Sequence, residues 1–245
     1  ASIAREYKII ILSDEIYALI SFKGHVHHSI AEYYSEGTIV TGGLSKDRSL
    51  GGFRLGVMLI PEEEKKLSNA ILSIGSETWS CASAPIQYAS IEAYKPNPVI
   101  LNHIKDCTSI HQIVINYAHN RFIEMGIRCS KPQGAFYLFP DWNKYKSYLR
   151  EKQILSSIDL SKTLLKEWNV ATLAGFEFGM PENDLCVRFS PVDYDGAKAL
   201  EIFQENRNYA FNNSEEFVIK VAPNVIYACN QIEKFTDSIK LNKDS

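Results

Sequence analysis

Residues 42–56 read GGLSKDRSLGGFRLG and place Lys46 and Arg54 in a segment that contains five glycines. Glycine adopts backbone conformations that other residues avoid, so a cluster of glycines marks a tight turn or a close approach to a ligand. Apolar runs lie on either side, at residues 38–42 (TIVTG) and 55–60 (LGVMLI). We therefore predict that Lys46 emerges at the end of a strand and that a turn brings Arg54 close to it.

A further apolar run, KIIILS at residues 8–13, ends at Asp14. Continuous apolar runs of this length are typical of strands buried on both faces, which belong to largely parallel sheets covered by helices. We expect an α/β fold with a partial, mostly parallel sheet. Ligands of such sheets bind outside the carboxyl ends of the strands, which is where Asp14 and Lys46 would lie.

The rest of the chain predicts helices and a second, α+β domain. Pro61 and the break at residues 95–98 (KPNP) start helices, and the helix after the break is long and ends at Gly126. We place the domain boundary between residues 97 and 98, with domains 1–97 and 98–245. The other expected elements are helices at 85–94, 157–168 and 196–206, strands within 131–141 and at 186–191, a polar joint at 206–214, and a last helix interrupted near Pro223.

Composition excludes several classes of function. The formal net charge is −3 and no run of lysine and arginine occurs, so we expect no nucleic-acid partner. No apolar run approaches the roughly 20 residues of a membrane span. The five cysteines are dispersed without a CxxC pair, which favours reduced thiols and a cytoplasmic protein. The histidines of GHVHH at residues 24–28 lack companions at metal-ligand spacing, so we favour an exposed loop and predict no metal site.

The candidate site residues form a chemically coherent set. A lysine at the end of a strand can form an imine with a carbonyl compound, and Arg54 can bind a phosphate through two hydrogen bonds. Ser45 adds a hydroxyl beside Lys46. Asp14 could keep a pyridine nitrogen protonated, and Tyr17 could donate a hydrogen bond to a phenolate oxygen next to the imine. Together they predict pyridoxal phosphate as the cofactor.

Several segments in order resemble fold-type I pyridoxal-phosphate enzymes of aminotransferase classes I and II. The resemblance implies that residues 1–97 are the C-terminal part of the large cofactor-binding domain, and that residues 98–245 are a linking helix and a small domain. The segments that carry it are SDEIY (13–17), GGLSKDRSLGGFRLG (42–56), SCASAPIQYA (80–89), KPQGAFYLFPD (131–141) and VRFSP (187–191).

The resemblance also implies a role for each site residue. Lys46 is similar to the lysine that holds the cofactor as an aldimine and moves the proton of the α-carbon. Asp14 corresponds to the aspartate at the ring nitrogen, and Tyr17 to the tyrosine at the ring oxygen. Arg54 and Ser45 would contact the phosphate.

Arg188 resembles the arginine that binds the α-carboxylate of the substrate. Strand alternation would turn Val187 and Phe189 to one side and Arg188 to the other. The implied reaction transfers an amino group between an α-amino acid and a 2-keto acid, and the implied assembly is a homodimer. Taken singly, Arg188 could instead pair with a surface acid, and Asp14 could cap a turn.

Two departures from the family pattern stand out. Gly43 occupies a position that often holds a hydroxyl residue, and the N-terminal half, with its phosphate-binding turn, stacking aromatic residue and asparagine, is not found. We therefore expect the chain alone to bind pyridoxal phosphate weakly or not at all. Two other functions remain open: a lyase or synthase similar to aminocyclopropane-carboxylate synthase, and a non-enzymatic sensor domain of a transcription regulator.

Overall fold

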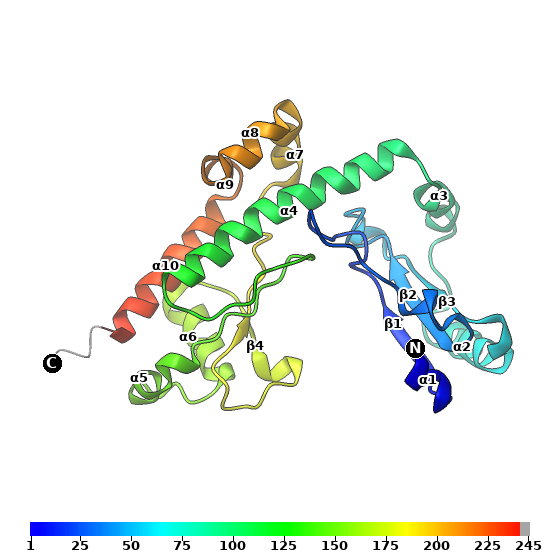
Figure 1. Ribbon diagram of the computed structural model, residues 1–245, viewed down its shortest axis with the longest axis horizontal. Coiled ribbons are helices and arrows are strands. Elements are labelled where there is room, and N and C mark those ends of the chain that lie inside the picture. Colours follow the sequence, from blue (N-terminus) through cyan, green and yellow to red (C-terminus); the bar gives the residue numbers. More distant parts are fainter. Residues whose placement is uncertain (241–245) are drawn as a thin grey trace. The chain divides into compact units, whose positions relative to one another are not determined.

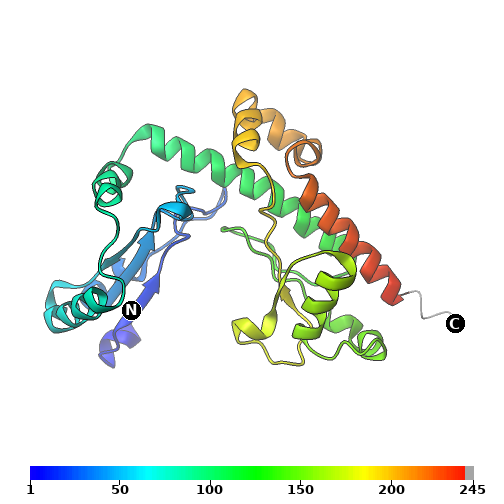
Figure 2. The same ribbon diagram turned by 180° about the vertical axis from the view of Figure 1, so that it is seen from behind.

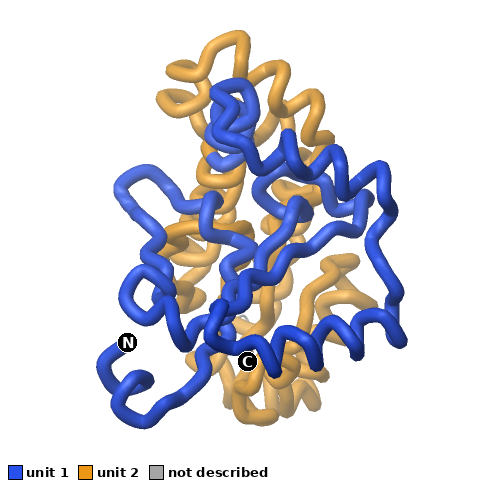
Figure 3. Tube along the Cα trace, turned by 90° about the vertical axis from the view of Figure 1, so that its right-hand side faces the viewer, with its two compact units in different colours: residues 1–108 blue, residues 109–245 orange. Residues whose placement is uncertain are grey.

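The structure, a computed structural model, describes residues 1–240 (Figures 1 and 2). The chain forms two compact units, Ala1–Thr108 and Ser109–Ser245 (Figure 3). The division falls inside the long helix α4 (Pro98–Glu124). The domain boundary expected between residues 97 and 98 stays a prediction.

Unit 1 contains a three-stranded sheet in the order β1 (Ile11–Asp14), β2 (Thr38–Gly43), β3 (Gly56–Leu59). All three predicted strands are present. β1 and β2 are parallel, as expected, but β3 runs antiparallel to β2, so the prediction of a mostly parallel sheet is wrong for this strand. The physical reason is the connection: the loop from β2 to β3 contains only the short 3-10 turn η3 (Gly51–Phe53), which cannot cross over the sheet, and it returns the chain directly beside β2.

The expectation that these strands are buried on both faces is also wrong. Ile39 in the central strand is 5% exposed, whereas Leu12 in β1 and Leu59 in β3 are each 66% exposed. An apolar run shows that the residues of a strand are hydrophobic. Whether they are buried depends on which other elements pack against the strand. In unit 1 the two outer strands expose apolar side chains.

The helices of unit 1 follow the predicted pattern. The run after Pro61 starts as a 3-10 turn, η4 (Glu62–Glu64), and continues as α2 (Lys65–Thr78). Proline fixes its own φ and donates no backbone N–H, which suits a helix start. The remaining helical elements are α1 (Ser2–Glu6), η1 (Ile30–Glu32), η2 (Ser35–Gly37), η3 (Gly51–Phe53) and α3 (Ala84–Tyr94).

Helix α4 is confirmed as one long helix that ends before Gly126. Gly126 has a φ of +79°, a left-handed conformation that glycine adopts without strain at a helix end. A Cβ at this position would lie 3.0 Å from the Tyr145 hydroxyl oxygen, so a larger residue would also be crowded. On the buried face of α4, Val114, Ala118 and Phe122 are completely inaccessible to solvent.

Unit 2 is mainly helical. Helix α10 (Pro223–Lys240) packs against α6 (Ser157–Trp168) and α5 (Lys146–Glu151) (Figure 2), and the strands β4 (Leu173–Ala174) and β5 (Val187–Arg188) pair antiparallel. No helix among residues 1–240 is long and apolar enough to span a membrane. The elements are η5 (Asn143–Tyr145), α5 (Lys146–Glu151), α6 (Ser157–Trp168), β4 (Leu173–Ala174), η6 (Gly175–Phe178), β5 (Val187–Arg188), α7 (Gly196–Glu205), α8 (Arg207–Asn212), α9 (Ser214–Val221) and α10 (Pro223–Lys240).

The predicted helices at 157–168 and 196–206 and the break near Pro223 are confirmed. The prediction of a polar joint at 206–214 is wrong, because most of this segment forms helix α8. The Asn206 side chain accepts a hydrogen bond from the Tyr209 N–H at 2.9 Å and caps this helix, and Ala210 is buried. The predicted strands at 131–141 and 186–191 reduce to isolated bridges and to the two residues of β5.

Candidate functional site

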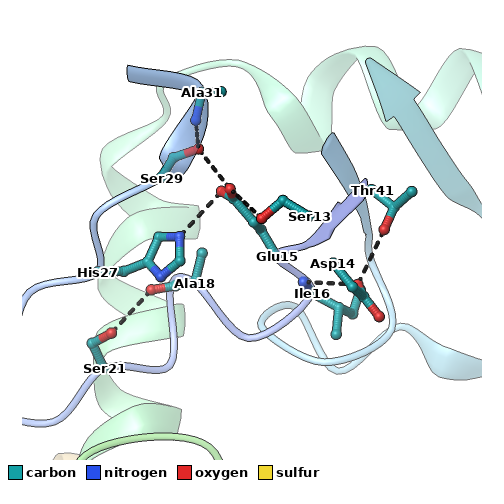
Figure 4. A network of polar contacts seen from close by, with 10 residues as sticks. All are labelled: Ser13, Asp14, Glu15, Ile16, Ala18, Ser21, His27, Ser29, Ala31 and Thr41. Carbon is teal, nitrogen blue, oxygen red and sulfur yellow. Dashed lines mark hydrogen bonds and ion pairs between the residues drawn. The ribbon is translucent and has the colours of Figure 1, made fainter. Parts of the chain in front are cut away.

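The parallel strands β1 and β2 end side by side, and polar residues follow both. Asp14 closes β1 and is the register partner of Thr41 in β2. One oxygen of the exposed Asp14 carboxylate, Oδ1, accepts hydrogen bonds from Thr41 Oγ1 at 3.2 Å and from the Ile16 N–H at 3.4 Å (Figure 4). These two bonds orient the carboxylate at the sheet edge, and no described residue donates to Oδ2.

Tyr17 and Lys46 meet at the same edge. Tyr17 lies in the turn that follows Asp14, and Lys46 lies in the loop that follows β2. The Nζ atom of Lys46 is 5.9 Å from the centroid of the Tyr17 ring, at the outer limit of a cation–π contact. The structure thus brings Asp14, Tyr17 and Lys46 to one edge of the unit 1 sheet.

The loop that carries Lys46, residues 44–55, is closed at its base by backbone hydrogen bonds. The Leu44 N–H donates to the Leu55 carbonyl at 3.4 Å, and the Leu50 N–H donates to the Leu44 carbonyl at 3.0 Å. Leu44 and Leu55 are 2% and 6% exposed. Buried side chains and paired backbone groups therefore fix the two ends of the loop.

Arg54 and Ser45 lie on this same loop. Arg54 is exposed, has a φ of 54°, and donates from Nη1 to the Gly51 carbonyl at 2.9 Å. Among the described residues no carboxylate pairs with its guanidinium. Ser45 is partly buried beside Lys46. A guanidinium without a carboxylate partner can bind an anion such as a phosphate, and Ser45 offers a hydroxyl on the same loop.

The structure explains why glycine stands at position 43. A Cβ there would lie 2.9 Å from the Leu55 carbonyl oxygen and 3.3 Å from the Gly56 Cα. The first distance is shorter than real Cβ contacts allow, and both neighbours are backbone atoms. A hydroxyl residue at this position would therefore force β2 and β3 apart.

A buried ion pair beside Lys46 was not expected from the sequence. Asp47 is 8% exposed, and its Oδ2 accepts a hydrogen bond from Arg48 Nη1 at 2.5 Å. Arg48 also donates from Nε to the Ala93 carbonyl at 2.9 Å and lies over the Tyr94 ring at 4.9 Å. The pair anchors the loop of Lys46 to the end of α3. Adjacent opposite charges are common in exposed loops, so no local pattern indicates that this pair is buried.

Arg188, in unit 2, shows the predicted alternation. Val187 and Phe189 are 0% and 3% exposed, while Arg188 between them is partly exposed. Its guanidinium carbon lies over the rings of Tyr137 and Phe178, 4.3 and 4.5 Å from their centroids. Aromatic rings attract the flat face of a guanidinium. Its N–H groups lie in the plane of the guanidinium, so these contacts do not use them as hydrogen-bond donors.

Comparison with known proteins relates most of the chain to one group. The family described as "Aminotransferase class I and II" matches residues 1–199. A probable N-acetyl-LL-diaminopimelate aminotransferase of Bacillus subtilis is 32% identical over 181 residues, which are 73% of this chain and 42% of that protein. An aspartate aminotransferase of the same species is 34% identical over 182 residues, 73% of this chain and 44% of that protein.

The fold is similar to that of solved structures in the same group. An aromatic aminotransferase from Pyrococcus horikoshii superimposes with a TM-score of 0.74 at 25% sequence identity. The match covers 98% of this chain and 54% of that one. The chain thus spans about half the length of the relatives that it matches.

Proposed function

Because the chain belongs to the class I and II aminotransferase family, we propose that it supplies the lysine-bearing part of a pyridoxal-phosphate-dependent aminotransferase. The reaction would exchange an amino group between an α-amino acid and a 2-keto acid. The observation that carries the proposal is the position of Lys46, Asp14 and Tyr17 at one edge of the unit 1 sheet. The chain spans 42% and 44% of its two Bacillus relatives, so the activity of the whole protein is part of the proposal.

The chemistry of these side chains fits the cofactor. Lys46 offers a primary amine for its aldehyde. Asp14 Oδ1 is engaged by Thr41 and Ile16, which leaves Oδ2 as the acceptor for a protonated ring nitrogen. A second polar group, Arg54 with Ser45, suits the phosphate.

The cofactor, when bound, supplies an electron sink for the charge that develops when the α-proton leaves. The amine of Lys46 takes that proton as a general base and returns it as an acid. Asp14 would hold the ring nitrogen in its cationic form, and Tyr17 would donate a hydrogen bond to the ring oxygen. Arg188 binds the α-carboxylate of the amino acid, for which its fork of N–H groups is suited.

The proposal is tested by trapping the lysine. The whole protein that carries this chain is incubated with pyridoxal phosphate and reduced with borohydride, and its peptides are mapped by mass spectrometry. We expect the label on Lys46, no label at this position in Lys46→Ala, and an unchanged label in Lys66→Ala, a control on the exposed face of α2. A label confined to lysines other than Lys46 contradicts the proposal.

Product analysis separates the proposed reaction from its closest alternative. An aminotransferase converts the amino acid to a keto acid, whereas a lyase or synthase releases a β- or γ-elimination product. The relatives are named for different substrates: N-acetyl-LL-diaminopimelate, aspartate and aromatic amino acids. We therefore propose the reaction without a particular amino acid.

A further inference from the structure

The residue after Asp14 lies in a cluster of hydrogen bonds that the proposed reaction does not use. The Glu15 side chain is 12% exposed, and its carboxylate accepts hydrogen bonds from Ser13 Oγ at 3.1 Å and from Ser29 Oγ at 2.5 Å. His27 Nε2 lies 3.1 Å from the other oxygen. In Figure 4 the side chains of Asp14 and Glu15 point apart, Asp14 toward Thr41 and Glu15 toward Ser29 and His27.

This cluster attaches an exposed loop to the end of β1. Residues 23–28 are all exposed, and Val26 is 77% exposed, so no apolar side chain anchors the loop. Ser29 and His27 attach its end to Glu15. Burial raises the pKa of Glu15, but the hydrogen bonds from Ser29, His27 and Ser13 together hold it below its ordinary value. The carboxylate is therefore ionised and accepts several hydrogen bonds at once.

The backbone of Glu15 links the same cluster to the candidate site. Its N–H donates to the Thr41 carbonyl in β2 at 2.8 Å, and its carbonyl accepts from the Ala18 N–H at 3.0 Å. The first bond extends the pairing of β1 and β2 past Asp14. The second closes the turn that contains Tyr17. Glu15 thus lies between Asp14 and the turn that contains Tyr17. Hydrogen bonds from Ser13, Ser29 and His27 fix its side chain.

We propose that Glu15 is a positioning residue, whose carboxylate, held by Ser13, Ser29 and His27, fixes the backbone that presents Asp14 and Tyr17 beside Lys46. The inference rests on the proposed function, because Asp14 and Tyr17 would contact the cofactor there. Glu15 acts through its neighbours and touches neither cofactor nor substrate. Its removal would leave two hydroxyls and an imidazole without their common acceptor, and would free the turn and the loop together.

The first test needs no cofactor. Amide hydrogen exchange is measured on the chain and on Glu15→Ala, Glu15→Gln and the control Glu36→Ala, a carboxylate of unit 1 that pairs with Arg5 at the surface. In Glu15→Ala we expect exchange to become roughly tenfold faster at residues 16–18 and 25–29, because hydrogen bonds to a charged group stabilise them. Glu15→Gln keeps an acceptor and should restore most of the protection. Unchanged exchange, or faster exchange spread evenly over unit 1, would overturn the proposal.

The second test measures whether the loss of the Glu15 carboxylate changes the absorbance and the binding of the cofactor. The pH at which the absorbance of pyridoxal phosphate on Lys46 changes is measured in the whole protein that carries this chain. We expect Glu15→Ala to shift this midpoint and to weaken cofactor binding roughly tenfold, and Glu15→Gln to lie near the wild type. A midpoint that Glu15→Ala leaves in place would show that Glu15 holds only the loop, and would sink the proposal. If Lys46 of the wild type takes no label, the proposed function fails instead, whatever the exchange result.

Discussion

At the scale of single residues, the guanidinium of Arg188 is held by aromatic rings. The rings of Tyr137 and Phe178 lie within 4.5 Å of it, and no carboxylate among the described residues pairs with it. Phe178 is itself packed edge-on against Phe139, with the ring centroids 6.0 Å apart. Such packing restricts the side chain of Arg188 and leaves its N–H groups for an external anion.

We therefore expect Arg188 to bind small dicarboxylates. Arg188→Gln should weaken the binding of succinate roughly 10- to 100-fold, the effect of losing a charge-assisted pair of hydrogen bonds. Saturation-transfer NMR with succinate measures this. Arg150→Gln, an exposed arginine in α5, is the control and should bind as the wild type does. Equal binding by the two variants would remove Arg188 from the substrate site.

Sequence alone points to residues that carry reactive groups more readily than to those that orient them. Lys46 and Asp14 are predicted as site residues because apolar runs end beside them, and the sheet edge that they share follows from the parallel pairing of β1 and β2. The hydrogen bond from Thr41 to Asp14 could not be predicted, because the local sequence pattern does not determine the register of the two strands. Tyr137 and Phe178 reach Arg188 from distant segments, which no spacing reveals.

At the scale of elements, the partly buried His111 joins α4 to two other segments of unit 2. His111 Nδ1 lies 2.8 Å from the hydroxyl of Tyr194, and its ring centroid is 5.0 Å from that of Phe136. Burial lowers the pKa of His111 from 6.5 to about 4. The imidazole is therefore neutral in the folded protein over most of the pH range in which an unfolded histidine is protonated.

The stability of unit 2 should consequently depend on pH through His111. Between pH 6.5 and about 4 the unfolded state binds a proton that the folded state does not, so the contribution is full above 6.5 and is lost as the pH falls. The free energy of unfolding should drop by up to ~1.4 kcal/mol per pH unit in this window. Urea unfolding of wild type, His111→Gln and the exposed control His28→Gln measures it. Of the two variants, only His111→Gln should lose this dependence of the free energy of unfolding on pH. If His111→Gln keeps the dependence, its assignment to His111 is wrong.

Elements with complete local signals are the ones that the sequence predicts well. Helix α6 starts with a capping box in which the Ser156 and Asp159 side chains each accept from the other's backbone N–H, and its predicted range is the observed one. Gly126 likewise ends α4 as expected. The direction of β3 and the shortness of β5 depend instead on partners elsewhere in the chain, so their apolar runs predicted strands without predicting the sheet.

At the scale of the whole molecule, the two units differ in how completely they bury their apolar residues. In unit 2 Trp142, Leu149 and Leu160 are all fully buried. In unit 1 the outer strands leave Leu12 and Leu59 each 66% exposed. Buried apolar area is the main stabilising contribution to folding, so unit 1 should be the less stable of the two.

We accordingly expect the chain to unfold in two steps, with unit 1 first. Trp79 of unit 1 is 66% exposed and its emission should change little, whereas Trp142 of unit 2 is fully buried and reports the loss of that core. Circular dichroism detects the helices of both units. In urea the helical signal should therefore begin to fall at a lower concentration than the one at which the fluorescence shifts, and Trp79→Phe should leave the fluorescence curve in place. Curves that superimpose would mean a single cooperative unfolding step, in which the exposed strands of unit 1 are as stable as the core of unit 2.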